Sequence, residues 1–523
     1  MKNRKSIIAG AILSIMLCVS IVAGATFALF ETKDEINVSV GSANVKITAT
    51  IGDLETYSYD ATENAQIRTV ASGTFTAGGT ATVGANGSLV LDRIAAGDKV
   101  TFNLNVKNES NIKTKWRTVV KCLNGRELYD GLAITLGGET KTVTAYEDLD
   151  IAPEGGETKT VAVSIELPYE AGNEFLNKNC ELVVRAEAVQ ANAAITEVTE
   201  ATEVKNSLAN GGTTLLSSDI ELSEAVTVAG GNATLDLNGN TLTMAQQIIV
   251  EDGNLNITNG KVVLTGIDDK DTGYDIRVTT GNSSVTVENS YIQAKKDAFF
   301  IVNDGNRTAP ALVIKNSTVK TETGGWFCIN TNAGSTENYN VDIEIENSTV
   351  IGGETAILFN IPGNLTVRNS TLISERSAVV LRAGNALIEN TVIYGRSSTA
   401  TLNYYNERNW TSGNEVTDAS LVIGNRNGSY RGDATCVLKN VTVLRNGALE
   451  GSRTICISGG NTVDGVQYGA SLVYDANCKM GVATDTDMLL DIESTEAMTN
   501  DCIYVDSKAP DRTKISINGI ALN

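Results

Sequence analysis

Three aspartates between positions 269 and 275 have a spacing that could hold a metal ion. Asp269, Asp271 and Asp275, with Gly273 between the last two, read D-x-D-x-G-x-D. Carboxylates placed around a glycine turn in this way can supply several oxygen ligands to Ca²⁺. The segment lacks the bidentate glutamate that ends an EF-hand loop. We therefore favour an exposed insertion over a calcium site, and we expect no other cofactor.

The chain contains no histidine. This excludes HExxH zinc sites, Ser-His-Asp triads and Cys-His dyads, whereas chemistry based on aspartate and arginine stays open. The adjacent pair Asp268 and Asp269 invites an acid–base interpretation. We favour a loop position without catalysis for this pair, and we predict no catalytic residue.

An aromatic segment at 402–410 (LNYYNERNW) stands out in a chain with 5% aromatic residues. Tyr404, Tyr405 and Trp410 could stack on sugar rings if they are exposed. The alternative is that these rings fold back and cover the flank of the domain. We slightly favour the second interpretation, and glycan binding stays open.

Charge and cysteine usage limit the possible partners. The net charge of −21 argues against nucleic-acid binding, which needs a basic surface. The cysteines show no CxxC or other metal-ligand spacing, and we expect most of them to be buried apolar residues. Cys122 and Cys180 could pair, since both lie in predicted strands.

The N-terminus is typical of an export signal. Lys2, Arg4 and Lys5 precede an apolar run over 7–23, and small residues then offer cleavage after Ala25 or Ala28. The alternative is an uncleaved membrane anchor, because residues 7–29 are long enough to span a bilayer. We favour cleavage and secretion to the medium or the cell surface.

A short phrase recurs through the second half of the chain. IENSTV at 345–350 returns as IKNSTV at 314–319 and VRNSTL at 367–372. A period in the twenties with variable insertions, and short strands without leucine-rich helices, predicts a parallel β-helix. The recurrent asparagine would lie at one corner of each coil and bond to its neighbours; this predicted ladder contains Asn289, Asn316, Asn347, Asn369, Asn390 and Asn440. The 50 residues between the last two should hold two coils.

The first half follows a different pattern. Alternating strands over 29–192 are separated by glycine-rich turns, which predicts an antiparallel sandwich. Residues 193–212 have apolar side chains at helical spacing and end in two glycines, so we predict a helix that caps the first coil. The expected organisation is a signal peptide at 1–28, a sandwich at 29–192, the capping segment at 193–212 and a β-helix at 213–523.

The sandwich region resembles the TasA/camelysin family of exported Gram-positive proteins, which carry a SipW-type signal peptide. Three stretches carry the resemblance: 24–47 (GATFALFETKDEINVSVGSANVKI), 94–117 (IAAGDKVTFNLNVKNESNIKTKWR) and 167–192 (LPYEAGNEFLNKNCELVVRAEAVQAN). The family implies a jelly-roll-like sandwich, a dedicated signal peptidase and a role in extracellular fibres or matrix. It also implies that residues 29–45 add a strand to a neighbouring subunit. The metalloprotease activity of the camelysin branch is not carried over, because histidine is absent.

Residues 213–510 resemble right-handed parallel β-helix proteins of the pectate-lyase-like class. The stretch at 234–244 (TLDLNGNTLTM) is similar to an opening coil of bacterial surface proteins of that type. Enzymes of this class are polysaccharide lyases or hydrolases. The GHG-like segment of the hydrolases and the RxxRxP-like segment of the lyases are both missing here.

The sequence therefore predicts an all-β chain, with a jelly-roll-like sandwich, a short capping helix and a right-handed parallel β-helix. The favoured function is that of an exported, non-catalytic structural or adhesive protein of the cell surface or biofilm matrix. Its partners would be copies of itself, other matrix proteins or glycans. The alternative is a carbohydrate-active β-helix enzyme or a glycan-binding protein.

Overall fold

The computed structural model describes residues 29–522 with gaps, the longest at 151–157, 267–274, 302–309, 332–340, 397–418 and 425–430. The chain divides into two compact units, Met1–Ala194 and Ile195–Asn523. Each unit has its own hydrophobic core. No helix in the described ranges is long and apolar enough to cross a bilayer.

The first unit is built from two antiparallel sheets. One sheet has the order β1-β2-β3-β8-β13-β10-β11, with β4 on β8 and β5 on β4, and the other has the order β12-β9-β14-β7-β6. The strands are β1 (Leu29–Glu31), β2 (Glu35–Val40), β3 (Val45–Ile51), β4 (Glu55–Asp60), β5 (Ala65–Arg68), β6 (Thr80–Val83), β7 (Leu89–Asp92), β8 (Lys99–Asn108), β9 (Thr114–Asn124), β10 (Ala133–Leu136), β11 (Glu139–Thr140), β12 (Glu147–Leu149), β13 (Thr158–Glu166) and β14 (Asn179–Gln190); a short helix α2 spans Arg126–Asp130.

Alternating apolar residues place the core of this unit between its sheets. Strand β8 alternates buried and more exposed side chains along its length, with Leu104 and Val106 fully buried. Strand β2 pairs with β3 on one side and with β1 on the other, both within the same chain, and β1 lies at the edge of this sheet. Cys122 and Cys180 are buried free thiols, so the expected pairing is not present.

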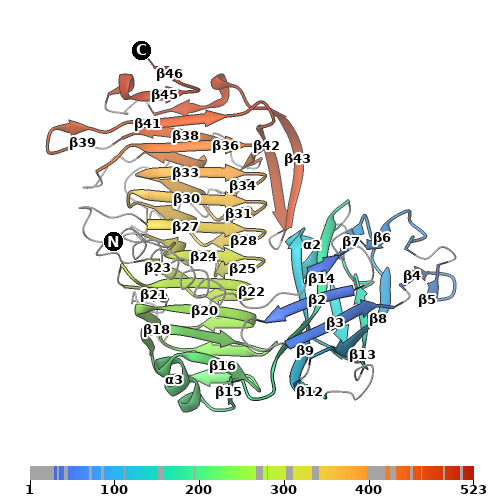
Figure 1. Cartoon of the computed structure of the whole chain (residues 1–523). Helices are drawn as coiled ribbons and strands as arrows, with labels where there is room; N and C mark the ends of the chain where they lie inside the picture. The colour runs from blue at the N-terminus through green and yellow to red at the C-terminus, as the bar shows by residue number, and fades with distance from the viewer. Residues whose placement is uncertain are drawn as a thin grey trace, which may run out of the picture. The chain divides into compact units, whose positions relative to one another are not determined.

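The second unit is a β-helix, in which successive coils stack (Figure 1). The coils contribute strands to three sheets of parallel strands, which we call the first, second and third faces. The first face contains β15 (Ile195–Val198), β16 (Gly212–Leu216), β24 (Leu312–Lys315), β27 (Val341–Glu346), β30 (Gly363–Arg368), β33 (Gly384–Glu389), β36 (Ala434–Lys439), β41 (Ala470–Tyr474) and β45 (Ile515–Ile517). The second contains β17 (Ile220–Leu222), β19 (Thr241–Met244), β25 (Thr318–Thr321), β28 (Thr349–Gly352), β31 (Thr371–Ser374), β34 (Val392–Gly395), β37 (Thr442–Asn446) and β42 (Lys479–Thr486).

The third face carries the site described below. It contains β21 (Ile276–Val278), β23 (Phe299–Ile301), β26 (Phe327–Asn330), β29 (Thr355–Phe359), β32 (Ser377–Leu381), β35 (Ala419–Gly424), β38 (Arg453–Gly459) and β44 (Tyr504–Val505). Three long strands bend across two or three faces: β18 (Val226–Asp236), β20 (Ile248–Leu264) and β22 (Ser284–Ala294). Hairpin partners and short turns complete the unit: β39 (Thr462–Val463), β40 (Val466–Gln467), β43 (Leu489–Ala497), β46 (Ile520–Ala521), η2 (Asn500–Cys502) and η3 (Arg512–Lys514).

Equivalent apolar residues stack in the interior from coil to coil. On the first face Ile314, Ile345, Val367 and Ile388 are successive register partners, and all four are buried. Burying a side chain of this size stabilises the fold by roughly 1.5 to 3 kcal/mol. The repeated strand sequence is therefore the sequence of one continuous core.

The N-S-T phrase forms the corner between the first and second faces. Asn316, Asn347 and Asn369 all have left-handed backbones, with φ between 48 and 49°, which asparagine tolerates better than most residues. The side-chain amide of Asn347 donates to Oδ1 of Asn316 over 3.3 Å. The amide of Asn390 donates to Asn369 over 3.1 Å.

The serine that follows makes a second ladder beside the first. The Ser348 hydroxyl accepts from the backbone N–H of Ser317 in the preceding coil at 3.2 Å, and it donates to the Glu346 carbonyl at 2.7 Å. Ser370 repeats both bonds one coil later. The serines of the phrase thus bond to backbone N–H and C=O groups at the corner, while the asparagines bond to one another through their side chains.

The long interval between Asn390 and Asn440 holds one coil, which corrects the expectation of two. Strand β33 pairs directly with β36, and the Asn440 amide donates to Asn390 Oδ1 over 2.9 Å. The extra residues are inserted between β34 and β35, within that coil.

A helix closes the first coil. Helix α3 (Ala201–Asn210) begins at a capping box formed by Glu200 and Glu203, and its Val204 and Leu208 are fully buried in the β-helix core. Figure 1 shows this helix at the end of the stack opposite β45 and β46. The predicted helix began too early, because Ile195–Val198 pairs with β16 as strand β15. The all-β prediction with a β-helix and a capping helix is confirmed.

Candidate functional site

A pair of buried carboxylates lies where two coils enter the third face. Asp275 directly precedes β21 and Asp297 lies two residues before β23, and these strands are register neighbours. Their side chains are 1% and 6% exposed. With Arg277, whose side chain projects from β21, they form what we call the carboxylate site.

Asp297 is held by donors from the next coil. Its Oδ1 accepts from the Phe327 backbone N–H at 2.9 Å, and its Oδ2 accepts from the Asn330 side-chain amide at 3.3 Å. Burial raises the pKa of Asp297 to about 7, and the charge of Asp275 raises it as well, while both hydrogen bonds oppose the rise. This carboxyl group therefore exchanges a proton near neutral pH.

Asp275 differs from its neighbour because it has a cationic partner. Nη2 of Arg277 lies 3.4 Å from Asp275 Oδ2. Burial raises the pKa of Asp275, and the guanidinium opposes that rise. The other oxygen, Oδ1, is buried without a hydrogen-bond partner among the described residues. Two neighbouring carboxylates thus lie in different environments, which is how proteins assign separate acid and base roles.

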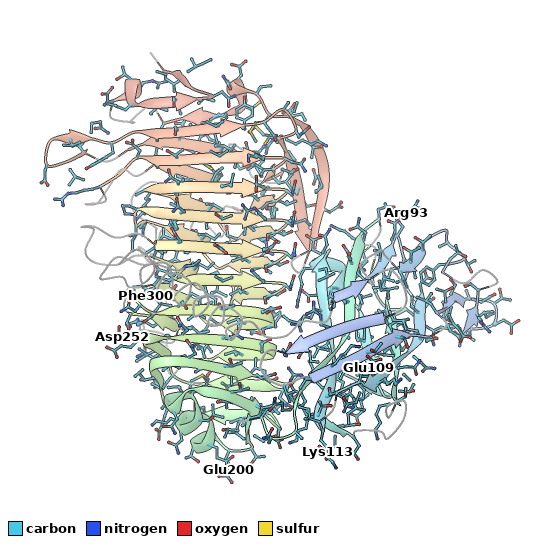
Figure 2. The ribbon with its side chains drawn as sticks, in the orientation of Figure 1. Arg93, Glu109, Lys113, Glu200, Asp252 and Phe300 are labelled. Atoms are coloured by element: carbon cyan, nitrogen blue, oxygen red, sulfur yellow. The ribbon has the colours of Figure 1, made fainter. Side chains whose placement is uncertain are left out.

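Aromatic rings border the site on its outer side. The Arg277 guanidinium lies 4.8 Å from the Phe300 ring centre, and Lys296 Nζ lies 5.5 Å from the Trp326 ring. Figure 2 shows Phe300 at the flank of the β-helix, on the side of Asp252. The Arg277 side chain is 27% exposed, so it forms the accessible part of the carboxylate site.

The later coils of the third face differ from these early ones. Further along, the outward positions are occupied by a buried apolar cluster that includes Leu358, Val380 and Val422. At the entry to β29 and β32, Glu354 and Arg376 form a buried ion pair at 3.5 Å across adjacent coils. Because this pair is internally compensated, the carboxylate site is the stronger candidate for chemistry.

The structure places the predicted site residues as follows. Asp275 is buried against Arg277 and is not in an exposed loop, whereas its proposed calcium partners Asp269 and Asp271 lie outside the described residues. The described ranges contain no group of three or more side chains arranged to hold a metal. Tyr404, Tyr405 and Trp410, and the signal cleavage positions Ala25 and Ala28, also lie outside the described residues.

Asp297 was missed by the sequence analysis, although a signal was available. A charged residue precedes the apolar strand of the third face in several coils, as in Asp297-Ala298, Glu354-Thr355 and Arg376-Ser377. Charged side chains are rarely fully buried unless they are paired or functional. The recurrence of such a residue beside an inward-facing run indicates a buried polar row.

Comparisons with known proteins give structural likeness alone. No protein-family model matches the chain, and no curated protein matches it in sequence. A pectate lyase from Paenibacillus sp. 0602 is similar over 64% of this chain and 86% of its own, at 10% identity and a TM-score of 0.32. The catalytic domain of a GH87 α-1,3-glucanase in complex with tetrasaccharides is similar over 90% and 98% of the two chains, at 12% identity and a TM-score of 0.28.

These similarities correct one expectation. The solved structures that match are carbohydrate-active enzymes, which contradicts the prediction that the chain is not an enzyme. TM-scores this low assign no activity to the chain.

Proposed function

We propose that the β-helix unit is a carbohydrate-active enzyme that hydrolyses a glycosidic bond at the carboxylate site. The observation that carries this proposal is the pair Asp275 and Asp297, two adjacent carboxylates of which one titrates at about 7. A protonated carboxyl beside an ionised one is the arrangement that glycoside hydrolysis requires.

The two aspartates would have separate roles. Asp297, protonated near neutral pH, would donate its proton to the oxygen of the leaving sugar. Asp275, whose ionised form is favoured by Arg277 at 3.4 Å, would take a proton from the attacking water. The net reaction adds one water across the bond and returns both carboxyl groups to their starting states after proton exchange with solvent.

The substrate would approach across the outer side of the site. Phe300 and Trp326 place aromatic rings beside the cationic groups of Arg277 and Lys296, and Arg277 offers hydrogen-bond donors at the rim.

The test is product release from a panel of neutral and uronate-containing polysaccharides. We expect new reducing ends with the wild type, and a decrease of at least about 100-fold in Asp297→Asn and in Asp275→Asn. Glu344→Gln is the matched control, because Glu344 is an exposed carboxylate on the first face of the same unit. Unchanged release in both aspartate variants, or no release from any polymer, would overturn the proposal.

We further propose that the chain is exported and acts at the cell surface or in the matrix. The support is the signal-like N-terminus and the resemblance of the first unit to TasA/camelysin proteins. In this proposal the sandwich provides surface association or self-assembly, and the β-helix acts on glycans there. Surface labelling of intact cells, followed by N-terminal sequencing of the mature protein, tests both export and cleavage after Ala25 or Ala28.

A further inference from the structure

A cavity lies in the later coils of the β-helix, away from the carboxylate site in sequence. It measures about 430 Å³ and is bordered by β37, β38, the β42–β43 hairpin and η2. This volume lies within the range of small-ligand sites. Its polar lining includes Arg445, Arg453, Ser452, Thr454, Thr495 and Glu496.

Two arginines give this cavity a positive wall in an otherwise acidic chain. The Arg453 guanidinium lies 3.7 Å from the centre of the Tyr504 ring, which fixes its plane. Nη1 of Arg445 donates to the Ser452 hydroxyl at 3.3 Å and to the Asn446 carbonyl at 3.4 Å. Neither guanidinium has a carboxylate within 4.0 Å among the described residues, although the net charge is −21.

The remaining lining distinguishes a sugar from a simple anion. The hydroxyl of the exposed Thr495 can pair with sugar hydroxyls, while Val482 supplies an apolar surface for a ring face. Glu496 contributes one negative charge, which disfavours doubly charged anions such as phosphate. A single carboxylate on a sugar matches the planar donors of arginine.

We propose that this cavity binds a uronate unit of an acidic polysaccharide, with Arg445 and Arg453 contacting the carboxylate. The inference requires that the β-helix binds carbohydrate, as proposed above, but it does not require cleavage. It adds to that function a binding site that would hold an acidic chain on the enzyme at a distance from the carboxylate site.

The first test is calorimetric titration of the full chain with trigalacturonate, the neutral trisaccharide maltotriose and sodium sulfate. We expect binding of trigalacturonate alone, and a Kd at least about 10-fold higher in Arg453→Gln and Arg445→Gln. Arg431→Gln is the matched control, because Arg431 is outside the cavity and pairs with Asp464. Equal melting temperatures of the variants would show that they fold.

A second readout uses Cys502, an exposed thiol that lines the cavity. We expect trigalacturonate to protect Cys502 from a maleimide reagent, as measured by peptide mass mapping, with Cys502→Ser as the unlabelled control. Absence of binding and protection, or equal protection by maltotriose or by sulfate, would overturn the inference. Binding of trigalacturonate without product release from any polymer would contradict the proposed hydrolysis but support this binding site. Product release without binding at this cavity would support the hydrolysis and contradict the binding site.

Discussion

The carboxyl group of Asp297 combines two conditions that favour a bound proton at neutral pH. It is buried, and a second carboxylate, Asp275, lies close enough to raise its pKa further. Arg277 is close enough to Asp275 to favour that residue's ionised form. At the residue scale, the site thus consists of two chemically identical side chains that lie in different environments.

The same burial has a consequence for stability. Since the pKa of Asp297 rises from its ordinary 3.8 to about 7 on folding, the folded state binds the proton more tightly. The contribution of the neutral carboxyl group to the free energy of unfolding is complete below pH 3.8 and is lost as the pH rises through about 7. Asp297→Asn removes the ionisation.

We therefore expect Asp297→Asn to be more stable than the wild type at pH 8, by roughly 2 to 4 kcal/mol. At pH 4 the difference should disappear or reverse, because both side chains are then neutral. Denaturant unfolding at the two pH values measures this. A variant that loses the same stability at both would show that the ionised carboxylate is not destabilising.

A second prediction at the residue scale concerns the stability contributed by the corner asparagines. Asn347→Ala forfeits the amide bond to Asn316 and places alanine at φ 48°, which should lower the free energy of unfolding by roughly 2 to 3 kcal/mol. Asn347→Gly is the matched control, because glycine accepts this φ and loses the hydrogen bond alone. Equal losses in the two variants would mean that backbone strain plays no part at the corner.

At the scale of elements, helix α3 closes the open end of the first coil. Its Leu208 is fully buried in the core of the β-helix, so Leu208→Ala should cost roughly 2 to 5 kcal/mol. Thr202→Ala, an exposed position on the same helix, should stay within about 0.5 kcal/mol of the wild type. Thermal and denaturant unfolding measure both. A Leu208→Ala variant as stable as the wild type would show that helix α3 does not stabilise the first coil.

The sequence predicts the coils well where one local rule governs the chain. The N-S-T phrase predicts the corners because asparagine suits the left-handed backbone there and serine bonds to the neighbouring coil. The prediction from sequence is wrong at Ile195–Val198, because these residues have helical spacing but pair with β16 as a strand. It also fails for the 50-residue interval, since an insertion within one coil has the same length as an extra coil.

The candidate site was harder to predict than the fold. Asp275 was recognised as a carboxylate of interest, but as part of a loop, because its burial depends on register with the next coil. Asp297 belongs to no catalytic motif, and the recurrent charged residue before the third-face strands marks only a buried position; its raised pKa arises from burial and from the charge of Asp275. Such a site depends on contacts between coils, which no local spacing encodes.

At the scale of the whole molecule, the chain consists of two units with separate cores. We expect a fragment of residues 195–523 to fold on its own, because its core and its capping helix are all internal to it. Circular dichroism should show β-structure and cooperative melting. A fragment that remains unfolded would mean that the first unit is needed for the β-helix to form.

The measurement that tests the central claim most directly is the pH dependence of product release by the wild type and by Asp297→Asn, from any polymer that the panel identifies. If Asp297 is the general acid, wild-type release should decrease as the pH rises above about 7, and the variant should show little release at any pH. Release by Asp297→Asn at the wild-type rate, with an unchanged pH profile, would contradict the assignment of the carboxylate site.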